Sequence, residues 1–120
     1  MNTSKALLFI EDQLQRSMID FVLIAKTAKE VVDDQVELST PIKIGVLKQD
    51  WTQSGVSILK MLIPEAKFTE KKVTLEHEEV PIEIKIIHGK YKNLQNPDRV
   101  FYNVTEFNIP NPFKNYYLYR

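Results

Sequence analysis

The residues that could take part in chemistry lie on three apolar segments of the chain. Thr27 follows the apolar run at residues 21–24, Lys43 interrupts the run at residues 41–47, and Glu83 interrupts the run at residues 80–87. A carboxylate such as Glu83 can bind a divalent cation, whereas the lysine ammonium donates hydrogen bonds and carries a positive charge. Each residue also has a structural interpretation, because Glu83 and Lys43 suit the solvated side of a strand and Thr27 suits the start of a helix.

The other polar and aromatic residues that could form a site are expected to have structural roles. Asp33 and Asp34 are expected at a solvated helix end, and His77 and His88 lack the i, i+4 helical spacing of a typical zinc site. The tyrosines near the C-terminus are expected to cover the core or a partner rather than to stack on bases. The sequence contains no cysteine, no Gly-x-Ser-x-Gly motif and no glycine-rich phosphate loop, so nothing in it supports a cysteine nucleophile or a serine hydrolase.

Length and composition indicate one globular domain, residues 1–120, with a real hydrophobic core. The 16 basic and 16 acidic residues give no formal net charge, which argues against strong electrostatic binding of duplex DNA or an anionic membrane. No apolar run approaches the roughly 20 residues of a membrane span. The absence of cysteine favours a reducing compartment, so we expect a cytoplasmic protein with no membrane partner.

The first third of the chain predicts a helix, a strand and a second helix. Apolar residues at helical spacing indicate a helix over residues 4–18, capped by Thr3 or Ser4. Residues 19–24 are rich in β-forming apolar side chains and predict a buried strand. Residues 25–32 predict the helix that follows this strand directly.

The remainder predicts a mixed sheet. A strand is expected over residues 41–47, and a helix near residues 54–63, capped by Thr52 or Ser54 and stopped by Pro64. Residues 72–76 and 80–87 alternate as a hairpin, with Val80, Ile82, Ile84 and Ile86 on one face. Residues 96–98 predict a turn, residues 100–102 and 106–109 are expected to be extended, and Pro112 suits the first turn of a last helix. The predicted fold class is α/β (α+β): a small mixed β-sheet flanked by helices.

The order of these segments resembles the nucleotidyltransferase-fold superfamily, which includes polymerase-beta-like enzymes and the minimal nucleotidyltransferases of toxin–antitoxin systems. The resemblance covers residues 19–88. In this family a strand ends in a small-residue turn that opens a helix beside the nucleotide triphosphate, and the next strand and a later strand carry the carboxylates that hold divalent metal ions. The segments at residues 96–98 and 109–113 resemble those of uncharacterised bacterial or phage relatives.

The resemblance implies a role for five residues. Ala25, Lys26 and Thr27 match the turn beside the nucleotide, Lys43 matches a carboxylate position and would face the nucleotide, and Glu83 matches the third carboxylate, which would bind metal and act in catalysis. The chain departs from the family pattern because Ala25 stands where glycine is usual, and because Pro41 and Lys43 stand where acidic residues would bind metal.

Three hypotheses follow. The leading one is a nucleotidyltransferase-like domain with lost or impaired metal-dependent transfer, which binds a nucleotide or a protein partner such as a toxin subunit. In this hypothesis Lys43 lies within ion-pair reach of Glu83 and supplies the charge that a metal supplies in active relatives. The second is an active Mg²⁺-dependent enzyme that uses Glu83 with Asp33, Asp34 or Asp50. The third is a protein-interaction module with no nucleotide site, and the sequence does not fix the oligomeric state.

Overall fold

The computed structural model describes residues 2–89 and 92–119. Within them, one sheet has five strands in the order β1-β2-β5-β4-β3, and a second sheet is the two-stranded hairpin β6–β7. The strands of the larger sheet are β1 (Val22–Leu23), β2 (Ile42–Leu47), β3 (Lys67–Phe68), β4 (Lys72–His77) and β5 (Val80–Ile87). The mixed α+β class predicted from the sequence is therefore confirmed.

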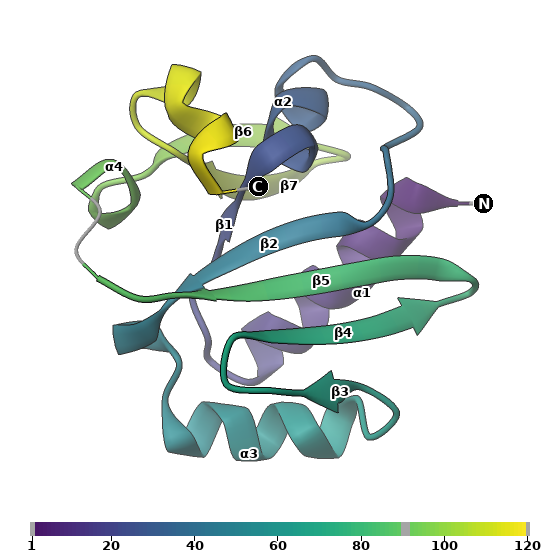
Figure 1. Cartoon of the computed structure of the whole chain (residues 1–120). Coiled ribbons are helices and arrows are strands. Elements are labelled where there is room, and N and C mark those ends of the chain that lie inside the picture. The colour runs from purple at the N-terminus through teal and green to yellow at the C-terminus, as the bar shows by residue number, and fades with distance from the viewer. Residues whose placement is uncertain (1, 90–91, 120) are drawn as a thin grey trace.

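The helices cover one face of the larger sheet and lie at both of its edges (Figure 1). α1 lies behind β2, β5 and β4, α3 lies beyond β3, and α2 lies beside β1 with the β6–β7 hairpin and the C-terminal η2. The bounds of these elements are α1 (Thr3–Arg16), α2 (Ala25–Val32), η1 (Lys48–Asp50), α3 (Gln53–Leu62), α4 (Lys92–Gln95), β6 (Asp98–Tyr102), β7 (Thr105–Ile109) and η2 (Phe113–Tyr119). The predicted helices over residues 4–18, 25–32 and 54–63 are confirmed to within two residues at each end.

β2 and β5 form the centre of the sheet and run parallel to each other. Because side chains alternate along a strand, residues that pair across the two strands share a face. The apolar set on one face, which includes Ile42, Ile44, Ile82 and Ile84, is buried in the main core on the side that α1 covers. The face predicted for Val80 to Ile86 is thus confirmed, and it explains why both strands are dominated by isoleucine and valine.

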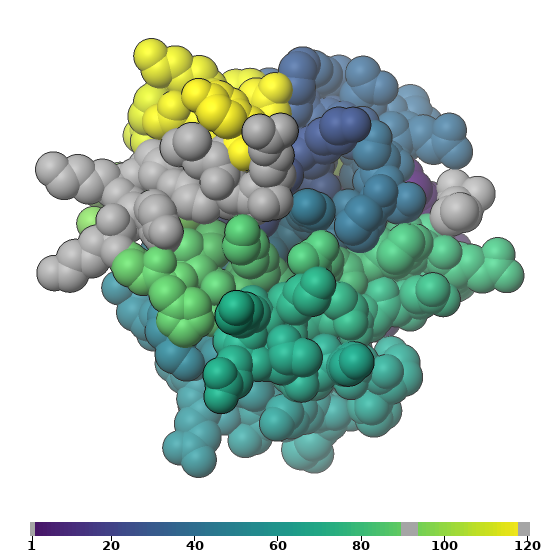
Figure 2. All heavy atoms as spheres, in the orientation of Figure 1, coloured from purple at the N-terminus to yellow at the C-terminus, as the bar shows by residue number. Residues whose placement is uncertain are grey.

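The opposite face of the sheet is polar over most of its area. Lys43 of β2 pairs with Glu83 of β5, Glu83 pairs with Thr74 of β4, and Thr74 pairs with Lys67 of β3, so these four side chains form a row across the sheet. In the orientation of Figure 1, no helix crosses this face, and Figure 2 shows side chains of β5 and β4 at the surface there. We call this surface the open face.

β4 and β5 form the predicted hairpin, joined by Glu78 and Glu79. Both glutamates have positive φ, of 48° and 71°, as the central residues of a type I′ turn do. The sequence left the turn class open because the Asn-Gly pair that usually marks such a turn is absent. The twist of a type I′ turn matches the twist of the two strands that it joins. This match favours the turn between β4 and β5 even though glutamate is not a usual residue at its two central positions.

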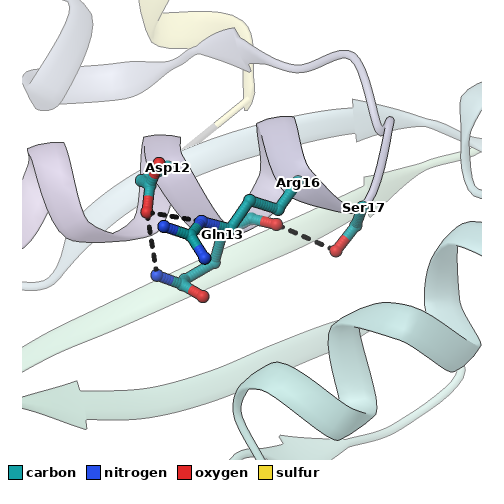
Figure 3. A network of polar contacts seen from close by, with 4 residues as sticks. All are labelled: Asp12, Gln13, Arg16 and Ser17. Atoms are coloured by element: carbon teal, nitrogen blue, oxygen red, sulfur yellow. Dashed lines mark hydrogen bonds and ion pairs between the residues drawn. The ribbon is translucent and has the colours of Figure 1, made fainter.

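α1 begins and ends with side-chain hydrogen bonds. The predicted cap at Thr3 or Ser4 is wrong: Asn2 Oδ1 accepts the hydrogen bond from the Lys5 N–H, while buried Thr3 Oγ1 accepts one from the Leu38 N–H. At the other end Arg16 pairs with Asp12 at 3.0 Å, and the hydroxyl of Ser17 donates to the Gln13 carbonyl (Figure 3).

The strand expected over residues 19–24 is reduced to Val22–Leu23, because Ile19 completes the end of α1 and Ile24 is the N-cap of α2. Met18 N–H donates to the Gln15 carbonyl and Ile19 N–H donates to the Leu14 carbonyl, with Met18 at a φ of 58°. This is the Schellman arrangement, whose left-handed position is usually glycine.

Replacing Met18 by glycine is expected to stabilise the protein by about 1 kcal/mol, because the side chain strains a left-handed residue and buries nothing. Met18 is 86% exposed. Urea unfolding measures the change. Met61→Gly is the matched control: Met61 is 80% exposed but has a right-handed backbone in the last turn of α3, where glycine destabilises by up to about 1 kcal/mol. A destabilised Met18→Gly protein would contradict the left-handed conformation of Met18.

Candidate nucleotide-binding site

A pocket of about 360 Å³ opens where the start of α2, the start of β2 and η2 come together. This volume is within the usual range for small-molecule sites. All four residues that the sequence resemblance places at the nucleotide line it, namely Ala25, Lys26, Thr27 and Lys43. The rest of the lining consists of Ser39, Thr40, Pro41, Tyr116 and Tyr117. We call this cavity the α2 pocket.

Ala25 is the residue at which β1 turns into α2. Its φ is 54°, in the left-handed region that favours glycine, although the sequence provides an alanine. The resemblance placed glycine at this position, and the turn has the geometry that a glycine would allow. The strained backbone positions the first turn of α2 at the pocket.

Thr27 connects α2 to β2. Its side chain is only 1% exposed, and Oγ1 accepts a hydrogen bond of 2.8 Å from the backbone N–H of Lys43. The carbonyl of Lys43 in turn accepts a hydrogen bond from the Ile24 N–H. Thr27 therefore holds the wall of the pocket in place, and its hydroxyl oxygen is engaged within the protein.

The pocket carries positive charge from two sides. Lys26 is exposed on the first turn of α2, and Lys43 is half-buried on the open face of β2. The first N–H groups of a helix lack intrahelical partners and favour anions. α2 has no acidic residue in its first turn, and its N-cap residue Ile24 makes no side-chain capping hydrogen bond. The local charge therefore suits a phosphate, although the chain as a whole is neutral.

The loop before β2 forms the polar wall of the pocket and is itself fixed. Ser39 makes two hydrogen bonds to Glu30 of α2, one from its backbone N–H at 2.8 Å and one from its hydroxyl at 2.7 Å. Pro41 then leads into β2. The loop is thus ordered by the same helix whose N-terminus faces the pocket.

Glu83 lies beside Lys43 but does not line the α2 pocket. The two residues are in register on neighbouring parallel strands and share the open face, as the leading hypothesis requires. The expected ion pair between them is nevertheless not found among residues 2–89 and 92–119. Glu83 instead pairs with Lys72 of β4 at 3.8 Å, and Lys85 follows on the same face of β5.

These surroundings do not fit Mg²⁺, which takes oxygen ligands. Lys43, Lys72 and Lys85 flank Glu83, and in the part of the chain that the structure describes no three acidic, histidine or cysteine side chains gather as a metal site would need.

The other carboxylates suggested for an active enzyme lie elsewhere. Asp33 and Asp34 follow the C-terminal end of α2, where Asp33 pairs with Lys29 at 2.6 Å. Asp50 lines a second pocket, together with Asp20 and Arg99. Burial, with a smaller contribution from nearby Asp20, raises the pKa of Asp50. None of the three aspartates lines the α2 pocket with Lys43.

The histidines and tyrosines also have defined positions. His77 stacks on Phe9 of α1, with ring centroids 3.8 Å apart, and His88 is exposed after β5. Tyr116 and Tyr117 line the α2 pocket, a contact that the sequence analysis did not assign to them. The sequence of residues 113–119 does not show which element the two tyrosines pack against, because their position depends on how η2 folds back onto α2.

None of the helices formed by residues 2–89 and 92–119 combines the length and the apolar character that crossing a membrane requires. Comparison with known proteins finds no matching family model, no matching curated protein and no matching solved structure.

Proposed function

We propose that this chain is a nucleotide-binding domain that resembles the nucleotidyltransferases and holds nucleotide phosphates with lysine side chains in place of a metal ion. One observation carries the proposal. The four residues that the resemblance assigns to the nucleotide come from two segments 16 to 18 residues apart, and all four line the α2 pocket. The cytoplasmic setting expected from the cysteine-free sequence belongs to the same proposal.

Charge supports an anionic ligand in this pocket. Lys26 approaches it from α2 and Lys43 from β2, and the N-terminal end of α2 adds its partial positive charge. Hydrogen bonds to phosphate from charged donors are stronger than those between neutral groups. A phosphate group placed between the two lysines would therefore be held without a divalent cation.

The surroundings of Glu83 support the loss of metal-dependent transfer. Clustered carboxylates repel one another unless a cation lies between them. At this position the open face carries Glu83 with lysines on both neighbouring strands, Lys43 and Lys72. The ammonium groups supply the positive charge that metal ions supply in the enzymes that the chain resembles, so binding is the activity we propose.

Isothermal titration of the protein with ATP in the presence of EDTA tests this function. Binding is expected without metal, and Lys26→Gln and Lys43→Gln are each expected to weaken it about tenfold, because each removes one charged hydrogen bond. Lys5→Gln is the matched control, since Lys5 is an exposed lysine of α1 that does not line the pocket. It should bind ATP as the unmodified protein does.

Equal losses in all three variants would point to a diffuse charge effect and contradict a site at the α2 pocket. Absence of ATP binding in EDTA would contradict the proposal as a whole. The protein would instead be an active enzyme if it incorporated label from a nucleotide, if this incorporation required Mg²⁺, and if Glu83→Gln abolished it.

A further inference from the structure

The α2 pocket has an aromatic wall that the phosphate-binding residues do not account for. This wall is formed by Tyr116 and Tyr117 of η2, which packs against α2. Lys26 and Lys43 provide charge, whereas the tyrosines provide flat apolar surface in the same cavity. A ligand that consisted of phosphate groups alone would leave this surface unused.

The aromatic wall is anchored in the core. Phe113 and Tyr116 are partly buried against the main hydrophobic cluster. Their rings stack, with centroids 5.2 Å apart and an interplanar angle of 21°. Tyr117 contacts Tyr116 edge-on, with centroids 5.8 Å apart. The three rings therefore form a continuous aromatic series that ends at the pocket.

Tyr117 is the end of this series that a ligand can reach. Tyr117 is 49% exposed, more than Phe113 or Tyr116, and its ring lies nearly perpendicular to the ring of Tyr116. Nucleobases stack on tyrosine rings with little dependence on which base it is, because every base has a π-face. The chemistry of Tyr117 thus suits a nucleobase, in the same cavity where lysines suit a phosphate.

We propose that Tyr117 stacks on the base of the bound nucleotide, so that the ligand class of the α2 pocket is a nucleoside phosphate and not a free polyphosphate. This inference rests on the proposed function, since it assumes that the pocket holds phosphate at Lys26 and Lys43. Stacking tolerates any base, so ATP, GTP, CTP and UTP bind with similar affinities.

Calorimetric titrations in EDTA with ATP and with inorganic tripolyphosphate test the inference. The unmodified protein is expected to bind ATP about tenfold more tightly than tripolyphosphate, which is the range of one base–aromatic stack. Tyr117→Ala is expected to remove this difference and leave the affinity for tripolyphosphate unchanged. Tyr117→Phe, which keeps the ring, should keep the difference.

The possible failures are distinguishable. Equal affinities of the unmodified protein for ATP and tripolyphosphate would overturn the role of Tyr117 and leave the proposed function standing. Equal losses for both ligands in Tyr117→Ala would show a packing role for Tyr117 and overturn stacking. Binding of neither ligand by the unmodified protein would overturn the proposed function itself.

Discussion

Replacing Lys43 by aspartate is expected to weaken ATP binding in EDTA by at least about a hundredfold, because a repulsive charge replaces an attractive one at the phosphate. The effect should exceed that of Lys43→Gln, which removes the attraction only. Lys43 lines the α2 pocket and also faces Glu83 in register on β5. The new carboxylate is therefore also expected to lower the free energy of unfolding by about 1 kcal/mol, since like charges on neighbouring strands repel.

A double substitution separates these two effects of Lys43. In Lys43→Asp combined with Glu83→Gln, the new carboxylate on β2 no longer faces a carboxylate on β5, so the part of the free energy of unfolding that this repulsion removes should recover. ATP binding should not recover, because Glu83 does not line the pocket. Recovery of both quantities would show that Lys43 acts through its strand neighbour, and would contradict direct contact with the nucleotide.

Replacing Thr27 by valine is expected to lower the free energy of unfolding by about 1–3 kcal/mol, because it leaves the Lys43 N–H without its acceptor in a partly buried position. The hydroxyl oxygen accepts this hydrogen bond at 2.8 Å, and the side chain is 1% exposed. Valine keeps the shape of threonine, so the change reports the hydrogen bond. Urea unfolding followed by circular dichroism measures it.

Thr27→Ser is the control for this hydrogen bond. Serine keeps the oxygen and loses one methyl group, so a loss of only about 0.8 kcal/mol is expected. A smaller loss in Thr27→Val than in Thr27→Ser would mean that packing of the methyl group, and not the acceptor, holds α2 to β2. ATP affinity should fall in Thr27→Val as well, because the hydrogen bond positions the strand that carries Lys43.

The central strands and the first helix could be predicted because each has a clear pattern of apolar residues in its own local sequence. Alternation of isoleucine and valine marks β2 and β5, and apolar residues at helical spacing mark α1. The shared face of Lys43 and Glu83 was also within reach, since both interrupt buried strands that become neighbours. Of the two expected caps of α3, Thr52 and Ser54, the structure has Thr52, whose hydroxyl oxygen accepts from the Gly55 N–H.

What the sequence did not reveal depends on contacts between distant segments. β3 is two residues long and exists through its pairing with β4, so it has no pattern of its own. The partner of Glu83 turned out to be Lys72, which only the register of the β4–β5 hairpin places nearby. Tyr117 reaches the pocket because η2 folds back onto α2. Backbone strain was also hidden, since Met18 and Ala25 adopt left-handed conformations without glycine.

The most direct test of the lysine-based nucleotide site is a titration of the ¹⁵N-labelled, unmodified protein with ATP in EDTA, followed by its amide NMR signals. We expect saturable shifts centred on the amides of Ala25, Lys26, Thr27 and Lys43, extending to Tyr117, and unchanged in position when Mg²⁺ replaces EDTA. Shifts that arise only with Mg²⁺ and centre on Glu83, or the absence of any shift at the α2 pocket, would contradict the account.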